Sequence, residues 1–286
     1  MKLVVIGARG MLGRDLVDCC GSRGISVRGY DLPEVDIASG ELSALNEADR
    51  CDWLINCAAY TDVDGAETDR AKAFAVNCTG AMNLAKWCRM RNMPMLHIST
   101  DYIFDGKSQS PYTENDAASP LCVYGESKLA GEEAVMSEAG RYLIVRSQSL
   151  FGAYGRNFVR AIMERLQKSD APLKVVTDQV SCPTWTLHLI EAIQHLMISG
   201  RHGVVNVSSS GECSWYEFAT QIASKVKPGA VVLPTTAAEY KRAARRPAYS
   251  VLDKSRYESW TSRRMPTWPE ALGGYLDHLD RLGMKV

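Results

Sequence analysis

Gly7-Ala8-Arg9-Gly10-Met11-Leu12-Gly13 is the stretch that decides the fold of this chain. It follows the apolar run at residues 3–6 and opens a helical pattern at residues 11–20, so it joins a buried strand to a helix. In that context Gly7 permits a tight turn, Gly10 lets the backbone approach a pyrophosphate, and Gly13 lets the helix pack on the strand. The N-terminus of the helix would then face the negative charge of the ligand. The loop therefore predicts a dinucleotide site, with Gly7, Arg9, Gly10, Met11, Leu12 and Gly13 as candidate residues.

The pattern of the first half extends this unit into a sheet. Apolar runs alternate with helical patterns: the runs lie at residues 3–6, 25–30, 53–59, 95–99 and 142–145, the helical patterns at 11–20, 69–90 and 124–139. Continuous apolar strands separated by helices are typical of a parallel sheet covered on both faces, with right-handed crossovers. We therefore expect an α/β protein, a doubly wound parallel sheet (Rossmann) with a smaller C-terminal substrate-binding lobe.

After residue 151 the elements become shorter and less regular. Helices are expected at 157–168, 184–198, 214–226 and 269–282, and strands at 173–177, 204–207 and 231–233. Ser214 and Glu217 have the spacing of a capping box. We expect residues 1–150 and 173–208 to form the dinucleotide-binding domain, and residues 151–172 and 209–286 to form the substrate-binding lobe.

Composition limits the partners of the chain. Its 286 residues contain 33 Lys and Arg against 33 Asp and Glu, and this neutral balance argues against a general nucleic-acid or membrane-surface role. The nine cysteines show no CxxC and no paired Cys/His ligand spacing, which is typical of reduced thiols in a cytosolic protein. The N-terminus lacks the core of a signal peptide, and no window approaches a membrane span. We expect a cytoplasmic protein with no nucleic-acid or membrane partner.

Tyr124 and Lys128 form a second constellation. Being four residues apart on a helix, they share one face, and an ammonium beside a phenol favours the phenolate and lowers the pKa of the tyrosine. Thr100 is expected at the carboxyl edge of the strand at 95–99, where ligands sit in open α/β sheets. Carbonyl reduction by hydride needs a proton donor, a cation that tunes it and grips the nicotinamide ribose, and a hydroxyl that holds the same oxygen. Thr100, Tyr124 and Lys128 are therefore the candidate catalytic residues.

Two residues give opposing signals about the cofactor. Asp31 ends the second strand, where an acid holds a ribose 2′-hydroxyl and favours NAD. Arg9, inside the glycine loop, would instead pair with the 2′-phosphate of NADP. We expect NADPH to be preferred, with NADH as the alternative.

Several further segments carry a resemblance to a known family. They are AAYTDVDGAE at 58–67, STDYIFDG at 99–106, PLCVYGESKLAGE at 120–132, NFV at 157–159, DQVSCPT at 178–184 and RPAYSVLD at 246–253. With the glycine loop and the Tyr124–Lys128 pair, they resemble the extended short-chain dehydrogenase/reductases and, within them, the dTDP-4-dehydrorhamnose reductase family. The resemblance runs nearly from end to end of the chain.

The resemblance implies NAD(P)H-dependent reduction of the C4 keto group of a nucleotide-linked 4-keto-6-deoxyhexose, first of all dTDP-4-dehydro-L-rhamnose to dTDP-L-rhamnose. It implies that Tyr124 donates the proton, that Lys128 tunes it and anchors the ribose, and that Thr100 completes the set. Outside the glycine loop the candidate cofactor residues are Asp31, Asp36, Ile37, Cys57, Ala58, Ala59, Tyr60, Asn77, Ser99, Tyr124 and Lys128. The candidate substrate residues are Tyr102, Phe104, Ser149, Asn157 and Arg246, the last within a basic run that includes Lys241, Arg242 and Arg245.

The chain departs from the family pattern at two positions. Ser149 stands where the family usually has a Trp beside the sugar, and Ser181 stands where it has a Gly. The missing ring leaves open a different 4-keto sugar nucleotide as substrate. Tyr102 follows Asp101 where related dehydratases carry a second acid, which favours reduction over elimination.

Three further expectations rest on the resemblance. A non-catalytic nucleotide-binding regulatory subunit, similar to that of methionine adenosyltransferase, is an alternative from another functional class. The family also implies a homodimer. The acidic residues that some relatives use for magnesium do not stand out, so we expect no essential metal.

Overall fold

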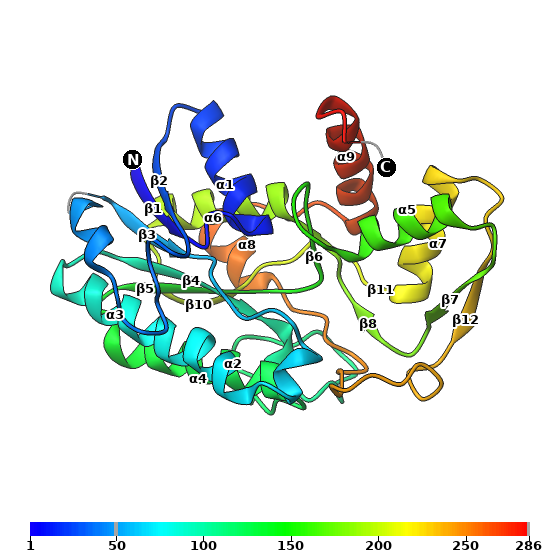
Figure 1. The fold of residues 1–286 in the computed structure, drawn as a ribbon, viewed down its shortest axis with the longest axis horizontal. Coiled ribbons are helices and arrows are strands. Elements are labelled where there is room, and N and C mark those ends of the chain that lie inside the picture. The colour runs from blue at the N-terminus through cyan, green and yellow to red at the C-terminus, as the bar shows by residue number, and fades with distance from the viewer. Residues whose placement is uncertain (49–50, 285–286) are drawn as a thin grey trace.

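A six-stranded parallel sheet organises the part of the chain that the computed structural model describes, residues 1–48 and 51–284 (Figure 1). The strand order is β10-β5-β4-β3-β1-β2, so the chain reverses its direction of winding between β1 and β3, where Gly7 leaves the sheet. Such a switch point is where doubly wound sheets bind their ligands. The predicted fold class is confirmed. The strands are β1 (Lys2–Ile6), β2 (Ser26–Tyr30), β3 (Trp53–Asn56), β4 (Met95–Thr100), β5 (Tyr142–Ser147) and β10 (Gly203–Asn206).

Helices cover both faces of this sheet (Figure 1). One face packs on α1, α6 and α8 around a core that includes Leu3, Leu189 and Tyr257, and the other packs on α3 and α4 around Val4 and Leu84. Burial on both faces explains why the strands read as continuous apolar runs. A π-helical turn at Ala75–Gly80 joins α2 to α3. The helices are α1 (Met11–Ser22), α2 (Arg70–Phe74), α3 (Ala81–Met90), α4 (Val123–Glu138), α6 (Thr186–Ser199) and α8 (Ser255–Thr261).

A second, smaller core lies beside the sheet (Figure 1). Phe151, Phe218 and Tyr275 are its largest fully buried side chains. The predicted capping box of Ser214 and Glu217 is present, and Thr267 and Glu270 form another. This core contains α5 (Phe158–Lys168), α7 (Trp215–Val226) and α9 (Trp268–Arg281), the pair β7 (Leu173–Val176) and β12 (Val232–Thr235), and the short pairs β6 (Leu150–Phe151) with β9 (Thr184–Trp185) and β8 (Val180–Ser181) with β11 (Cys213–Ser214).

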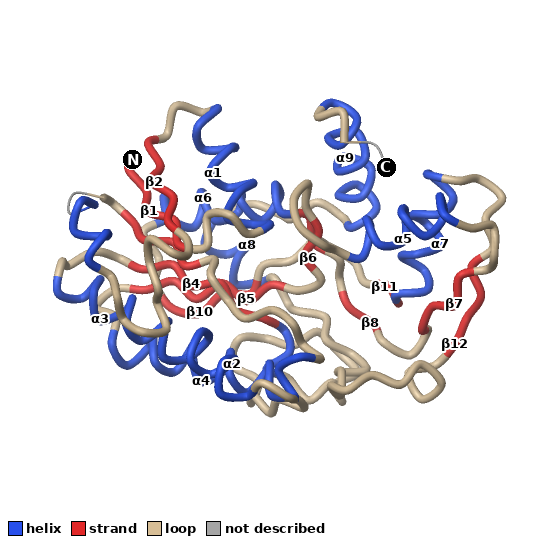
Figure 2. The backbone as a smooth tube through the Cα atoms, viewed as in Figure 1, coloured by secondary structure: helices blue, strands red, loops and turns tan. Residues whose placement is uncertain are grey.

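The chain crosses between the two cores several times. Within residues 173–208, β7 pairs with β12 beside the second core, whereas β10 joins the main sheet. Within residues 209–286, α8 returns to the main sheet through Tyr257. Figure 2 shows that loops form most of these crossings. The predicted division into two domains stays a prediction, and the seven residues of α8 are a helix that the sequence pattern did not indicate.

Two expectations from composition can be compared with the described residues. No disulfide links the nine cysteines, all of which lie in the described part of the chain. Among the described helices, none combines the length and the apolar character that crossing a membrane requires.

Candidate active site

The glycine loop meets the segment that follows β3. Gly7 has a φ of +78°, and a Cβ there would lie 2.6 Å from the backbone nitrogen of Ala58. A Cβ on Gly13 would collide with the carbonyl of Gly7. No side chain caps the N-terminus of α1, so its first N–H groups remain available to an anion. This turn, with glycines where the backbone approaches most closely and an uncapped helix N-terminus, fits the pyrophosphate of a dinucleotide.

Met11 and Leu12 differ in their access to that turn. Met11 is half-buried in the first turn of α1, whereas Leu12 packs into the sheet core. The side chain of Leu12 therefore points away from the glycine loop, and only its backbone faces the loop.

Arg9 and Asp31 take different roles at the end of β2. The two carboxylate oxygens of Asp31 accept the backbone N–H groups of Arg9 at 2.8 Å and of Leu32 at 2.9 Å. The Arg9 guanidinium pairs with Glu34 at 2.6 Å and is 63% exposed. Asp31 is thus occupied in holding the loop, while Arg9 presents a positive charge beside it. This arrangement favours a 2′-phosphate over a free 2′-hydroxyl.

Two buried amides fix the segment at Ala58, Ala59 and Tyr60. Asn56 accepts the N–H of Ala58 at 3.0 Å. Asn77 accepts the N–H of Tyr60 at 2.8 Å and donates to the carbonyl of Tyr60 at 3.1 Å. Asn77 is 1% exposed and fixes the segment at Tyr60, while its contact with the cofactor stays a prediction.

The remaining cofactor candidates lie close to the sheet. Asp36 accepts the N–H of Ala38 at 3.0 Å and closes a turn. The side chain of Ile37 packs in the sheet core against Gly80, and its place beside an adenine stays a prediction. Cys57 is half-buried, and burial raises the pKa of its thiol to about 12. Ser99 is buried, and its hydroxyl has no partner among the described residues.

Thr100, Tyr124 and Lys128 converge at the carboxyl end of β4. Tyr124 and Lys128 project from the first turns of α4, and the Tyr124 side chain hydrogen-bonds to Thr100. Lys128 is 2% exposed and donates from Nζ to the carbonyl oxygen of Ile98 at 2.6 Å. The Tyr102 ring meets the Tyr124 ring edge-on with centroids 5.5 Å apart. The structure therefore brings together the three residues that the sequence selected.

The electrostatics of this group differ from the expectation. Burial raises the pKa of Tyr124, the hydrogen bond with Thr100 lowers it in part, and Asp101 raises it further. Lys128 does not lower the pKa of the phenol as expected, because its ammonium turns to the Ile98 carbonyl. Burial also lowers the pKa of Lys128 to about 8, against the opposing effect of Glu132. The phenol therefore stays protonated at neutral pH, as a proton donor must.

Asp101 is a site residue that the sequence analysis did not select. Its carboxyl is 2% exposed, and burial raises its pKa to about 6 against hydrogen bonds from Ser250 and Thr100. Thr100 donates to Asp101 at 3.1 Å and accepts the N–H of Tyr102 at 3.2 Å. The position of Asp101, directly after Thr100 at a strand end, was the available signal.

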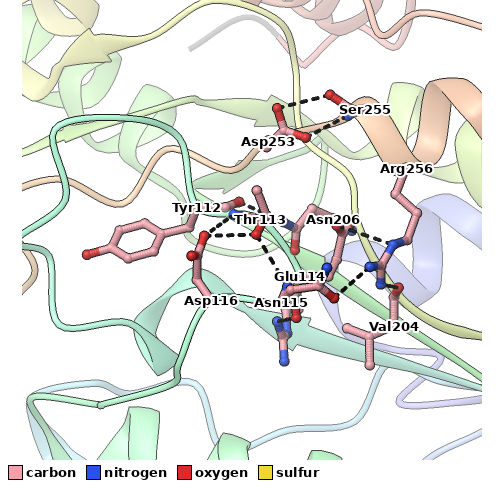
Figure 3. A network of polar contacts seen from close by, with 11 residues as sticks. Tyr112, Thr113, Glu114, Asn115, Asp116, Val204, Asn206, Asp253, Ser255 and Arg256 are labelled. Atoms are coloured by element: carbon pink, nitrogen blue, oxygen red, sulfur yellow. Dashed lines mark hydrogen bonds and ion pairs between the residues drawn. The ribbon is translucent and has the colours of Figure 1, made fainter.

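A polar network fixes the long segment between β4 and α4 (Figure 3). Glu114 accepts the backbone N–H of Asn206 at 2.8 Å and pairs with Arg256 at 3.4 Å. The amide of Asn206 donates to the carbonyl of Tyr112 at 2.9 Å, and Arg256 donates to the carbonyl of Val204 at 2.8 Å. The segment that leads to Tyr124 is thus bound to β10 and to α8, which supports a defined position for the phenol.

A cleft of about 1450 Å³ lies beside Tyr102 and extends along the second core. Four of the five substrate candidates line it: Tyr102, Ser149, Asn157 and Arg246. Its charged lining is mostly basic and consists of Arg156, Arg165, Lys174, Lys241, Arg242, Arg245 and Arg246 against Asp62 and Asp64. In a chain of zero net charge this concentration of cations fits an anionic ligand.

Phe104 and Asn157 have structural roles. Phe104 is fully buried, stacks on Tyr112 with ring centroids 4.3 Å apart and does not line the cleft, so its contact with the sugar stays a prediction. Asn157 caps α5 by accepting the N–H of Arg160 at 3.1 Å, and its amide donates to the carbonyl of Gly152 at 2.9 Å. Asn157 still lines the cleft, but both ends of its amide are engaged.

The two positions that depart from the family pattern touch each other. The hydroxyls of Ser149 and Ser181 lie 2.8 Å apart, and Ser149 has a φ of +48°. Two changes that are distant in sequence are therefore one local change, in which Ser149 lines the cleft and Ser181 is buried.

Residues 1–281 match the family model of the RmlD substrate binding domain. The chain belongs to the RmlD family. A dTDP-4-dehydrorhamnose reductase of Burkholderia thailandensis is 35% identical over 295 residues, covering 96% of this chain and 97% of that protein. A probable dTDP-4,6-dihydroxy-2-methyloxan-3-one 4-ketoreductase of Streptomyces antibioticus is 37% identical over 281 residues, covering 95% and 93%. The fold is also similar to the crystal structure of dTDP-4-dehydrorhamnose reductase from Bacillus anthracis in complex with NADP, with a TM-score of 0.93 and 35% sequence identity. The match covers 97% of this chain and all of that one.

For this RmlD-family chain the predicted absence of an essential metal stays a prediction. Among the described residues, no cluster of three or more His, Cys, Asp or Glu side chains has an arrangement that could hold a metal ion.

Proposed function

We propose that this protein is an NADPH-dependent reductase of the C4 keto group of a dTDP-linked 4-keto-6-deoxyhexose, with dTDP-4-dehydro-L-rhamnose as its substrate. The observation that carries the proposal is the convergence of Thr100, Tyr124 and Lys128 beside a basic cleft. The relatives from Burkholderia and Streptomyces, named above, are both named for reactions on dTDP-linked keto compounds. Reduction needs a proton donor held beside a hydroxyl and a cation, and a binding subunit does not, so the grouping of Tyr124 with Thr100 and Lys128 argues against the regulatory alternative.

The residues present fit a dinucleotide. The backbone of the glycine loop would hold the pyrophosphate and Arg9 would meet the 2′-phosphate, while Ala58 lies against the loop. When bound, NADPH supplies the hydride that reduces the C4 carbon.

Tyr124 supplies the proton. Its hydroxyl transfers H⁺ to the C4 oxygen as negative charge develops there, and its raised pKa keeps it protonated until that moment. The Lys128 ammonium, which is mostly protonated at pH 7 with a pKa of about 8, is held by the Ile98 carbonyl and would anchor the nicotinamide ribose. Thr100 holds the phenol in place through its hydroxyl.

The cleft sets the class of substrate. Its excess of cations suits the diphosphate of a nucleotide sugar, because guanidinium groups bind phosphate oxygens through charge-assisted hydrogen bonds. The hydroxyl pair of Ser149 and Ser181 favours a second candidate, a 4-keto sugar nucleotide other than the rhamnose precursor. The homodimer and the cytoplasmic location stay predictions.

The test is NADPH oxidation by the purified protein with dTDP-4-dehydro-L-rhamnose and with a panel of dTDP-, GDP- and UDP-linked 4-keto sugars. Tyr124→Phe should lower kcat by about 10²–10⁴ and leave NADPH binding unchanged, because only the transferable proton is removed. Turnover of another sugar in the panel alone would select the second candidate. Absence of turnover with every sugar, or a Tyr124→Phe variant as active as wild type, would overturn the proposal.

A further inference from the structure

The basic loop at residues 240–246 folds around one carboxylate. Asp64 Oδ2 lies 3.2 Å from Arg242 Nη1 and 3.2 Å from Arg246 Nη2, and its Oδ1 accepts the backbone N–H of Ala244 at 3.0 Å. Burial alone would raise the pKa of Asp64, but Ala244, Arg246 and Arg242 together lower it. Three residues of the loop, every second one along the chain, therefore contact the same carboxylate. This carboxylate is ionised and comes from the other side of the cleft.

Asp64 stands on a segment that hydrogen bonds fix beside α4. Asp62 accepts the N–H of Gly65 at 2.9 Å, which closes the turn that carries Asp64. Glu67 accepts the N–H of Val123 at 2.9 Å, and Val123 is the first residue of α4, directly before Tyr124. The segment that carries Asp64 is thus hydrogen-bonded to the start of the helix that carries the proposed proton donor.

The two arginines keep most of their donors free. A guanidinium has five N–H groups, and Arg242 and Arg246 each direct a single nitrogen to Asp64. Arg246 Nε is buried and has no partner among the described residues. Both arginines line the cleft together with Tyr102. Both side chains therefore have donors that Asp64 does not use, at the wall of the space that the nucleotide sugar would occupy.

We propose that Asp64 is a positioning residue that fixes Arg242 and Arg246 for the diphosphate of the substrate; this inference rests on the proposed function. Without Asp64, two long side chains must be ordered when the ligand binds, which weakens affinity. Removing the negative charge of Asp64 would by itself strengthen phosphate binding. Because the Asp64 side chain is 31% exposed, however, water screens its repulsion of a phosphate. The loss of order in Arg242 and Arg246 should therefore affect affinity more than the removal of the charge.

The experiment is calorimetric titration of dTDP and of thymidine into the full-length wild-type protein and its variants. Asp64→Ala should raise the Kd of dTDP about tenfold, or about 1.4 kcal/mol, and leave thymidine and NADPH binding unchanged. Asp64→Asn keeps an acceptor for the Ala244 N–H, so its effect should be smaller. Glu164→Ala is the matched control: Glu164 is exposed on α5, makes no ion pair among the described residues, and changes the net charge equally.

Two further measurements separate positioning from a general loss of structure. In steady-state assays Asp64→Ala should raise KM for the sugar nucleotide and leave kcat within about twofold, because Tyr124 is untouched. In an Arg242→Ala/Arg246→Ala background, Asp64→Asn should have no further effect on dTDP binding. Unchanged or tighter dTDP binding by both Asp64 variants would overturn the inference while leaving the proposed function intact. A wild-type protein that binds no dTDP would overturn the proposed function, and this inference with it.

Discussion

Lys128→Met is expected to stabilise the protein at neutral pH while it abolishes reduction. Burial lowers the pKa of Lys128 from its ordinary 10.5 to about 8. At about 1.4 kcal/mol for each pKa unit, keeping the ammonium charged costs the folded state roughly 3 kcal/mol near pH 7. The variant also leaves the Ile98 carbonyl without its donor at 2.6 Å, a loss of about 1–3 kcal/mol. The net expectation at pH 7 is a gain of about 1 kcal/mol in the free energy of unfolding.

The sign of this effect should reverse with pH. Because the folded pKa lies below the unfolded one, the unfolded chain binds more protons between pH 8 and pH 10.5, and wild-type stability rises through that window. At pH 10.5 most of the cost of burying the charge is gone, so Lys128→Met should there be less stable than wild type by about 1–3 kcal/mol, the lost hydrogen bond.

Urea unfolding at pH 7, 9 and 10.5 measures this reversal. Lys72→Met is the control, because Lys72 is exposed on α2, and its stability should stay within about 0.5 kcal/mol of wild type at each pH. The reasoning is refuted if the difference between Lys128→Met and wild type is the same at every pH. NADPH oxidation should be lost in Lys128→Met and retained in Lys72→Met.

Three other substitutions test separate parts of the structure. Burial raises the pKa of Asp101 from 3.8 to about 6, so between these two pH values the folded state binds a proton that the unfolded chain has lost. Wild-type stability should therefore fall as the pH rises from about 4 to about 6, and Asp101→Asn should remove this fall. Urea unfolding of this variant at pH 7 should show a gain of up to about 3 kcal/mol, and a slope like that of wild type would contradict the assignment. Ser262→Gly should add about 0.5–1 kcal/mol in thermal unfolding, because Ser262 ends α8 with a φ of +56°; a lower Tm would count against it. Arg9→Ala should raise KM for NADPH about tenfold with little change for NADH, since only NADPH carries the 2′-phosphate, and equal effects on both would disprove that role.

Short-range rules were enough to predict the parts of the site that depend on local chemistry. Gly7 and Gly13 are required by backbone contacts within one turn and its neighbouring strand, which is why their spacing identifies the loop. The sheet followed from continuous apolar runs, because strands buried on both faces have no polar alternation. Thr100 was placed correctly because the end of a parallel strand lies at a known edge.

Contacts between distant segments explain what the sequence did not predict. Asn77 was selected as a cofactor contact, and spacing gave no sign of its hydrogen bonds to Tyr60 and Ser127, which are 17 and 50 residues away along the chain. Phe104 lies in a loop, where no periodicity distinguishes a side chain that faces a cleft from one that stacks on Tyr112. The four-residue spacing put Lys128 on the same face as Tyr124, yet the Ile98 carbonyl on another element decides where its ammonium points. Spacing fixes the face of a helix, whereas the surrounding core fixes the hydrogen bond.

The division of labour between the two cores explains how such a site can change its substrate and keep its reaction. Thr100, Tyr124 and Lys128 belong to the main sheet and its helix α4, whereas most of the basic lining of the cleft comes from α5, β7 and the loop after β12. Ser149 and Ser181 face each other where the chain passes between these parts. A substitution there alters the wall that meets the sugar without moving the proton donor, since α4 is held by separate contacts from Glu67. Changes on the second-core side should therefore appear in KM and in substrate choice, and changes around Asp101 and Lys128 should appear in kcat and in its pH dependence.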